Sequence, residues 1–178
     1  MAGEKATVAG ATEAPFRIEL LGPGHEREHF QCGEPALDHY LRQQAGQDAR
    51  RRVSACFVAV EIVSHRLAGY YTLSAGGLAL NELPEPLARR LPRYPSVPIA
   101  RLGRLAVDGQ FQGRRLGAAL LADAMWRASR SEVAVHAMVV DAKDDAAINF
   151  YRHHGFMHFG SLPRQLMLPL QAWPGLRP

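Results

Sequence analysis

The sequence has few cysteines and contains no long apolar run. Its two cysteines, Cys32 and Cys56, are too few for a disulfide framework, and no Cys or His spacing typical of a zinc site surrounds them. No apolar segment approaches the roughly 18 residues that a membrane helix needs, and none near the N-terminus has the apolar core of a secretory signal. These absences favour a protein of the reducing cytoplasm without a structural metal.

The length of 178 residues and the apolar fraction of 47% suit one globular domain with a single core. Residues 1–14 are small, polar and aperiodic, which predicts a disordered leader. Residues 172–178 contain Pro174 and Pro178 and are expected to form a coil tail. The folded domain is therefore expected over residues 15–171.

Apolar periodicity along this domain predicts an alternation of strands and helices. Strands are expected over residues 16–20, 53–62, 67–80, 99–107, 133–140 and 164–170, and helices over 34–50, 114–131 and 144–153. Residues 81–98 hold five of the twelve prolines, which predicts an irregular segment with one helical turn at 87–91. This order of elements favours an α/β fold in which helices flank a mixed sheet.

Arginine supplies nearly all of the positive charge, because Lys5 and Lys143 are the only lysines among 21 basic residues. The arginines form three groups: Arg50, Arg51 and Arg52; Arg89, Arg90 and Arg93; and Arg101, Arg104, Arg114 and Arg115. A guanidinium group can pair with phosphate through two parallel hydrogen bonds, so these groups suit a phosphate-rich partner. A genome rich in G and C, which encodes arginine wherever a surface cation serves, explains the same composition.

The segment most informative about function runs from Leu105 to Ala118, where a predicted strand meets a predicted helix through a glycine-bearing turn. Such a turn presents unpaired backbone N–H groups, and the helix dipole adds positive charge there, which suits a pyrophosphate. A nucleotide triphosphatase loop is excluded because Lys-Ser and Lys-Thr are absent. A Rossmann turn is excluded by the missing second glycine and by the order of elements. A strand–helix turn that binds nothing is the structural alternative.

The turn resembles the acetyl-coenzyme A loop of the GNAT acetyltransferase family, Q/R-x-x-G-x-G/A. Gln112, Gly117 and Ala118 match this pattern, whereas Arg115 stands where the family has its first glycine, and a near-helical backbone is expected there. The resemblance implies one GNAT domain whose mostly antiparallel sheet contains a splayed strand pair. It also implies backbone contacts to the pantetheine arm in the strand and to pyrophosphate in the turn. The residues assigned to this coenzyme site are Leu105, Ala106, Val107, Gln112, Gly113, Arg114, Arg115, Leu116, Gly117, Ala118 and Asn149.

Residues 144–156 resemble a second motif of the same family, the N-x-x-A-x-x-F-Y…G-F helix. Asp144 replaces the usual asparagine, and Tyr151 matches the catalytic tyrosine that protonates the departing coenzyme A thiolate. A free thiol has a pKa of about 8.5 and a phenol one of about 10, so a tyrosine can donate a proton as the thiolate forms. The backbone N–H of Val107 is the candidate donor to the oxyanion. The alternative is that Tyr151 only packs, as a helical aromatic side chain usually does.

The N-terminal half resembles one subgroup of this family, the toxins of type II toxin–antitoxin modules that acetylate the α-amine of aminoacyl-tRNA. The likeness is carried by Phe30-Gln31-Cys32-Gly33, by Leu37-Asp38-His39-Tyr40-Leu41 and by Gly69-Tyr70-Tyr71-Thr72-Leu73-Ser74. It implies a homodimeric toxin that blocks translation and is silenced by a ribbon-helix-helix antitoxin. The residues expected to flank the acceptor side and to bind tRNA are Arg50, Arg51, Arg52, Arg89, Arg90 and Arg93.

Two other functions fit the same residues. A housekeeping acetyltransferase would act on a small-molecule or protein amine, since the fold alone does not name the acceptor. A non-catalytic coenzyme A-binding module would keep the turn, but it would have no need for a proton donor such as Tyr151 beside the sulfur.

Overall fold

The computed structural model describes residues 15–176, and within them seven strands form one sheet in the order β1-β2-β3-β4-β5-β7-β6. The strands are β1 (Phe16–Leu20), β2 (Ala55–Glu61), β3 (Leu67–Ala79), β4 (Ser96–Val107), β5 (Ala137–Asp141), β6 (Met157–His158) and β7 (Gln165–Pro169). All neighbouring strands pair antiparallel except β4 and β5, which pair parallel. The expected mixed, mostly antiparallel sheet is confirmed. The expected leader, residues 1–14, lies outside the described residues.

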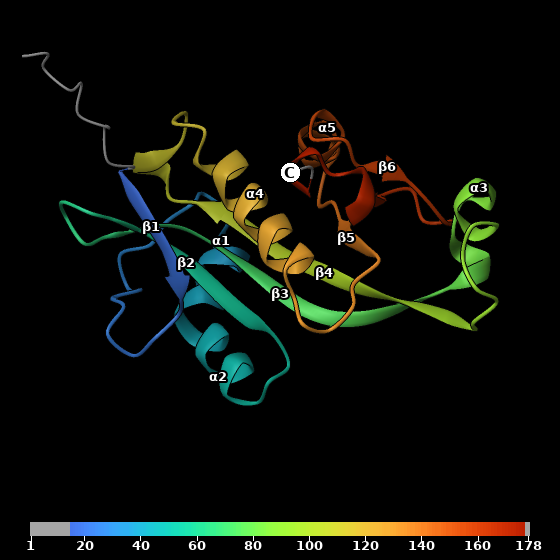
Figure 1. The fold of residues 1–178 in the computed structure, drawn as a ribbon. Coiled ribbons are helices and arrows are strands. Elements are labelled where there is room, and N and C mark those ends of the chain that lie inside the picture. Colours follow the sequence, from blue (N-terminus) through green and yellow to red (C-terminus); the bar gives the residue numbers. More distant parts are fainter. Residues whose placement is uncertain (1–14, 177–178) are drawn as a thin grey trace, which may run out of the picture.

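Helices flank this sheet (Figure 1). They are α1 (Pro35–His39), α2 (Ala45–Arg50), α3 (Glu85–Ala88), α4 (Leu116–Ser129) and α5 (Asp145–His153). A π-helical segment, Tyr40–Gln44, joins α1 to α2, so the helix expected over residues 34–50 contains a π turn in its middle. Single 3₁₀ turns lie at Leu80–Glu82, Gly109–Phe111, Leu170–Ala172 and Pro174–Leu176.

Side chains that alternate along β3 divide the core between the two faces of the sheet. Tyr70 packs with Phe30 and Leu41 on the side of α1 and α2, whereas Tyr71 packs with Leu120 on the side of α4. Successive strand residues point to opposite faces, so these two groups of helices cover opposite faces. The α5 side chains belong to the same cluster as those of α4.

Several element boundaries differ from those predicted. β4 begins at Ser96, inside the segment expected to be irregular, because it pairs with β3 as far as Ala79. β5 begins at residue 137 rather than at the predicted residue 133. The His136 N–H still donates to the carbonyl of Pro98 in β4 (2.8 Å). The parallel ladder does not extend further because Pro98 has no N–H to donate to β5. Strand β6, which pairs with β7, was not predicted.

The expected coil tail also differs in its described part. Residues 172–176 include a 3₁₀ turn instead of coil throughout. Trp173 is half-buried and packs against the core cluster that contains α4, which holds this segment against the domain.

Strands β4 and β5 diverge after a short paired stretch. Ile99–Leu102 of β4 pair with Ala137–Val140 of β5, whereas β4 continues to Val107 beside β3 alone. A bulge at Gly103 shifts the β3–β4 register just past the last residue that β4 pairs with β5. The splayed strand pair is thereby confirmed, and residues 103–107 have one edge without a strand partner.

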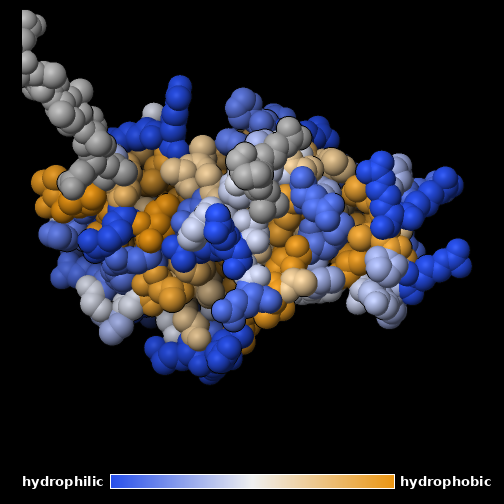
Figure 2. All heavy atoms as spheres, in the orientation of Figure 1, coloured by the Kyte–Doolittle hydropathy of each residue, from blue (hydrophilic) through white to orange (hydrophobic). Residues whose placement is uncertain are grey.

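Figure 2 shows hydrophilic side chains projecting from the α3 end of the molecule, with exposed apolar side chains in small separate patches. Within residues 15–176, no helix combines the length and the hydropathy needed to cross a membrane.

Candidate active site

The turn between β4 and α4 is held in place by a buried aspartate. Asp108, which is 2% exposed, accepts hydrogen bonds from the backbone N–H groups of Gln31 (2.9 Å) and Gln110 (3.0 Å). The Gly109 N–H donates in turn to the Gln31 carbonyl (2.8 Å). The turn is therefore fastened to the loop that precedes α1. Sequence reasoning missed Asp108, although an aspartate directly before a glycine at a strand end is typical of a turn.

Two residues of this turn have a left-handed backbone, Gly113 (φ 76°) and Arg115 (φ 60°). The prediction of a near-helical backbone at Arg115 is therefore wrong, because the backbone there is left-handed. A side chain with a Cβ is strained in this region and glycine is not, which explains why the motif that the turn resembles has glycine here. Arg115 gives no side-chain cap to α4, so the first amides of that helix are open to an anion.

A cavity of about 720 Å³ opens beside these amides. The turn and the start of α4 line one side of it, and Phe150 and His153 of α5, with His154 just after the helix, line the other. A Cβ on Gly117 would lie 3.8 Å from Val107 Cγ2 and 3.9 Å from the Phe150 ring, which are ordinary contact distances. Neither neighbour requires glycine at residue 117, whereas a ligand passing over the start of the helix would.

Two polar side chains of the turn face other parts of the protein. The Gln112 side-chain amide donates to the carbonyls of Cys32 and Val107, both at 3.1 Å, so it holds the turn to its neighbours. The Arg114 guanidinium lies over the ring of Phe111, 5.4 Å from its centroid. The turn therefore presents main-chain groups to the cavity rather than these two side chains.

The amides of Leu105 and Val107 face the open edge of β4. The Asp108 N–H donates to the carbonyl of Ala68 in β3 (2.9 Å), and main-chain groups alternate in direction along a strand. The main-chain N–H and C=O groups of Leu105 and Val107 consequently point away from β3, toward the edge of β4 where pairing with β5 has ended. Ala106 points toward β3. Of the three strand residues expected at the coenzyme site, Leu105 therefore offers its N–H and C=O groups and Val107 its N–H, because the Val107 carbonyl accepts from Gln112.

Tyr151 lies on the inner face of α5 and is 8% exposed. The ring centroids of Phe150 and Phe156 are 5.2 Å and 5.4 Å from that of Tyr151. Burial raises the pKa of Tyr151 to about 12. The phenol is therefore protonated at neutral pH, which is the state that a proton donor requires.

Asp144 caps the helix that carries Tyr151. Its carboxylate accepts a hydrogen bond from the Ala147 N–H (2.8 Å), and this bond lowers the pKa of Asp144. The Asp144 side chain therefore caps the start of α5. Asn149 is exposed on the same helix and is not one of the residues that line the cavity.

Residues 53–158 match the family model described as an acetyltransferase (GNAT) domain. The chain belongs to the GNAT family of acetyltransferases. The matched region runs from the start of β2 to β6 and so includes the splayed strand, the turn and α5. A GNAT acetyltransferase takes its acetyl group from acetyl-coenzyme A, whose pyrophosphate and amide-bearing arm suit the open amides of the turn and of β4. Within residues 15–176, no group of three or more His, Cys, Asp and Glu side chains is placed to hold a metal ion.

Two relatives, one of them in two solved structures, show which GNAT proteins the chain resembles. It is 38% identical over 141 residues to a tRNA-acetylating toxin of Mycobacterium tuberculosis, and the match covers 78% of this chain and 82% of the relative. The structure of AtaT complexed with acetyl-methionyl-tRNAfMet superposes with a TM-score of 0.81 at 30% identity, covering 88% of this chain and 96% of AtaT. A mutant AtaT toxin bound to the C-terminus of the antitoxin AtaR and acetyl-CoA gives a TM-score of 0.73 at 27% identity, covering 89% and 96%.

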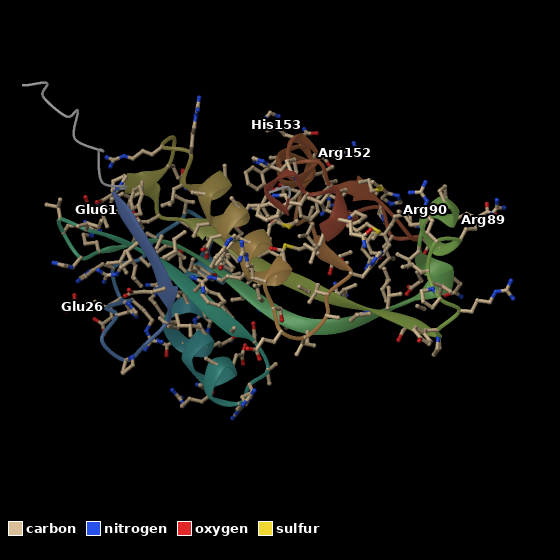
Figure 3. The ribbon with its side chains drawn as sticks, viewed as in Figure 1. Glu26, Glu61, Arg89, Arg90, Arg152 and His153 are labelled. Carbon is tan, nitrogen blue, oxygen red and sulfur yellow. The ribbon has the colours of Figure 1, made fainter. Side chains whose placement is uncertain are left out.

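The two arginine groups expected at the acceptor side do not form one surface. Arg50 ends α2, and Arg51 and Arg52 follow it in the turn before β2. Arg89 and Arg90 follow α3, which lies at the far end of the β3–β4 ribbon, well away from α2 (Figures 1 and 3). Arg93, in the segment after α3, is exposed like the others.

Proposed function

We propose that this acetyltransferase transfers the acetyl group of acetyl-coenzyme A to the α-amine of aminoacyl-tRNA and thereby blocks translation. The observation that carries the proposal is the 38% identity to a tRNA-acetylating toxin over most of both chains. The AtaT structure supports it, because the acetylated methionyl group in that complex is the product that such a reaction leaves.

The coenzyme would be held mainly by the backbone. The open amides at the start of α4, together with the positive end of the helix dipole, suit the pyrophosphate. The main-chain groups of Leu105 suit an extended arm that bears amides, because such an arm can pair with an unoccupied strand edge. The exposed Arg115 side chain adds positive charge at the mouth of the same cavity.

Acetyl-coenzyme A supplies its acetyl group as a thioester. The acceptor nitrogen bonds to the acetyl carbon, the carbon–sulfur bond breaks, and Tyr151 gives its phenolic proton to the departing sulfur while the amine proton passes to solvent. The raised pKa of Tyr151 weakens it as an acid, so the proton moves only as charge develops on the sulfur beside it. The Val107 N–H, which faces the open edge, is the proposed hydrogen-bond donor to the carbonyl oxygen.

The biological setting belongs to the same proposal. A toxin of this kind acts in the cytoplasm, where tRNA is aminoacylated, and needs a partner that silences it. The complex of AtaT with the C-terminus of AtaR supports a protein antitoxin as that partner. We propose an antitoxin of the ribbon-helix-helix type and a homodimeric enzyme.

Transfer of radiolabelled acetyl groups tests the acceptor directly. The purified chain is incubated with labelled acetyl-coenzyme A and either aminoacyl-tRNA or deacylated tRNA. Label is expected on aminoacyl-tRNA alone, and mild alkali should release it by cleaving the ester bond. Polyamines and peptide amines are assayed in parallel. Efficient transfer to one of these amines, with none to aminoacyl-tRNA, would overturn the proposal in favour of a housekeeping acetyltransferase.

A further inference from the structure

Two arginine side chains from different elements meet over one glycine of α2. A Cβ on Gly46 would lie 3.2 Å from Arg27 Nη1 and 3.5 Å from Arg50 Nη1. Arg27 comes from the loop before α1, and Arg50 comes from the last turn of α2. The two guanidinium groups therefore lie beside each other on a surface that glycine leaves bare.

A third guanidinium lies on the same side of the sheet, against the helices α1 and α2. Arg104 of β4 is stacked on the ring of Tyr40, with 3.5 Å between its guanidinium carbon and the ring centroid. Arg27, Arg50 and Arg104 are called here the arginine row.

The arginine row has no ion-pair partner in the described part of the chain. Within residues 15–176, none of its three members takes part in an ion pair. Asp48 in the same region accepts the Tyr40 hydroxyl instead (2.9 Å). Arg27 and Arg104 are half-buried, and neighbouring cations are unfavourable in such a place unless an anion joins them.

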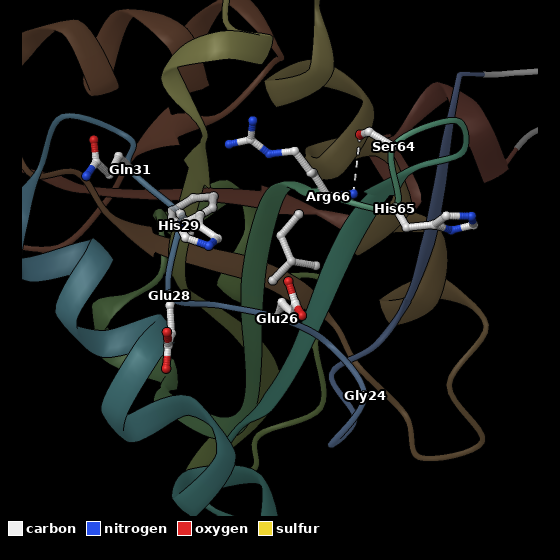
Figure 4. A pocket seen from close by; sticks show the side chains of 10 residues that line it. Gly24, Glu26, Glu28, His29, Gln31, Ser64, His65 and Arg66 are labelled. Carbon is white, nitrogen blue, oxygen red and sulfur yellow. Dashed lines mark hydrogen bonds between the residues drawn. The ribbon is translucent and has the colours of Figure 1, made fainter.

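The acidic residues beside Arg27 share a space of about 380 Å³ with it and also border a larger one. Glu26 and Glu28 line a space of about 820 Å³ between this loop and the turn that joins β2 to β3, together with His29 and His65 (Figure 4). Neither carboxylate lies within ion-pair distance of Arg27. They leave Arg27 without an ion pair and form an acidic border beside it that would repel a misplaced phosphate.

The arginine row lies on the acceptor face of the sheet. Arg104 and Ala106 are two residues apart on β4 and so share a face, and Ala106 packs with Tyr40 and Leu41 on the side of α1 and α2. The coenzyme turn lies on the opposite side, with α4 and α5. An acceptor must reach the splayed strands from the side that the coenzyme leaves free, which is the side of the row.

We infer that the arginine row binds backbone phosphates of the acceptor nucleic acid and guides its aminoacylated end toward β4. This inference rests on the proposed function and adds Arg27 and Arg104 to the residues that contact the acceptor. Arg104 directly precedes Leu105, whose open amide borders the reaction site, so a phosphate bound there lies near the end of the nucleic acid. The planar guanidinium fork suits phosphate oxygens better than a lysine does.

Anisotropy of fluorescently labelled aminoacyl-tRNA over a range of salt concentrations tests the row. Arg27→Ala and Arg104→Gln should each weaken binding about threefold to tenfold at low salt and flatten the salt dependence by up to about one unit. Arg27→Lys keeps the charge and should keep most of the salt dependence. Arg17→Ala is the matched control, because Arg17 is an exposed arginine of β1 already paired with Glu19. Affinity for acetyl-coenzyme A should be the same in all variants.

The outcomes separate the row from the proposed function. Row variants that bind like Arg17→Ala, in a wild-type background that acetylates aminoacyl-tRNA, overturn the inference and leave the proposed function standing. Loss of coenzyme affinity instead of tRNA affinity would place the row on the donor side and also overturn it. A wild-type protein that neither binds nor acetylates aminoacyl-tRNA overturns both. If Arg104→Gln fails to fold, the Arg27 pair decides alone, because Arg27 lies at the surface of α2.

Discussion

The Gln112 side-chain amide donates to the Val107 carbonyl at 3.1 Å and thereby ties the coenzyme turn to the last residue of β4. A second hydrogen bond from the same amide to Cys32 extends this tie to the loop before α1. We therefore propose that the glutamine of the motif positions the turn in this chain and that backbone amides bind the phosphate.

Gln112→Ala should remove both hydrogen bonds and loosen the turn. Each such bond contributes about 0.5–1.5 kcal/mol, so a roughly tenfold weaker acetyl-coenzyme A affinity is expected. Isothermal titration calorimetry measures it. Gln110→Ala is the control, because the Gln110 side chain bonds Arg66 away from the cavity. Equal affinities in the two variants would show that Gln112 does not position the turn.

The left-handed backbone at Arg115 predicts an unusual order of stabilities. Glycine should be more stable than alanine at residue 115 by about 1 kcal/mol, since only glycine is free of strain at φ 60°. This reverses the order seen in a helix interior, where alanine is favoured. Urea denaturation of Arg115→Gly and Arg115→Ala gives the two free energies of unfolding. An alanine variant as stable as the glycine variant would contradict the backbone conformation described above.

Gly117 should be needed by the ligand and not by the fold. Gly117→Ala is expected to fold with little loss of stability, because its Cβ meets Val107 and Phe150 at 3.8–3.9 Å. Acetyl-coenzyme A affinity should nevertheless fall, and Gly117→Asp should weaken it further by placing an anion beside the phosphates. Calorimetry on folded variants tests this. Unchanged affinity in the aspartate variant would remove the turn from the site.

The pH dependence of acetylation follows from the raised pKa of Tyr151. Because burial moves this pKa upward to about 12, the phenol stays protonated through the range in which an α-amino group of pKa about 7.7–8.0 loses its proton. The rate at low acceptor concentration should rise through the amine pKa and then level off. An amide-linked aminoacyl analogue avoids ester hydrolysis in this assay. A fall near pH 9 that disappears in Tyr151→Phe would contradict the assignment.

The sequence was sufficient for features that depend on local patterns. Period-two alternation predicts the strand at Phe16–Leu20, and the glycine-bearing turn predicts the open start of α4. The limits of β5 could not be predicted, because Val133 and Val135 alternate like a strand while the pairing depends on Pro98, far away in the chain.

Features that depend on pairing or on distant contacts had no sequence signal. Whether Ala106 or Val107 offers an open amide depends on the register between β3 and β4. The approach of Arg27 to Gly46 joins two elements that no motif relates. The left-handed backbone at Arg115 was not predicted either, because arginine stands where a glycine would have indicated it.

The Tyr151→Phe variant tests the central claim most directly. It removes one hydroxyl and keeps the ring among Phe150 and Phe156, so stability and coenzyme affinity should be unchanged. Single-turnover acetylation of aminoacyl-tRNA should slow by about 10²–10⁴-fold, the usual contribution of a positioned general acid. Expression without an antitoxin should arrest growth for the wild type and be tolerated for the variant. A folded Tyr151→Phe protein that acetylates aminoacyl-tRNA at the wild-type rate would show that Tyr151 only packs.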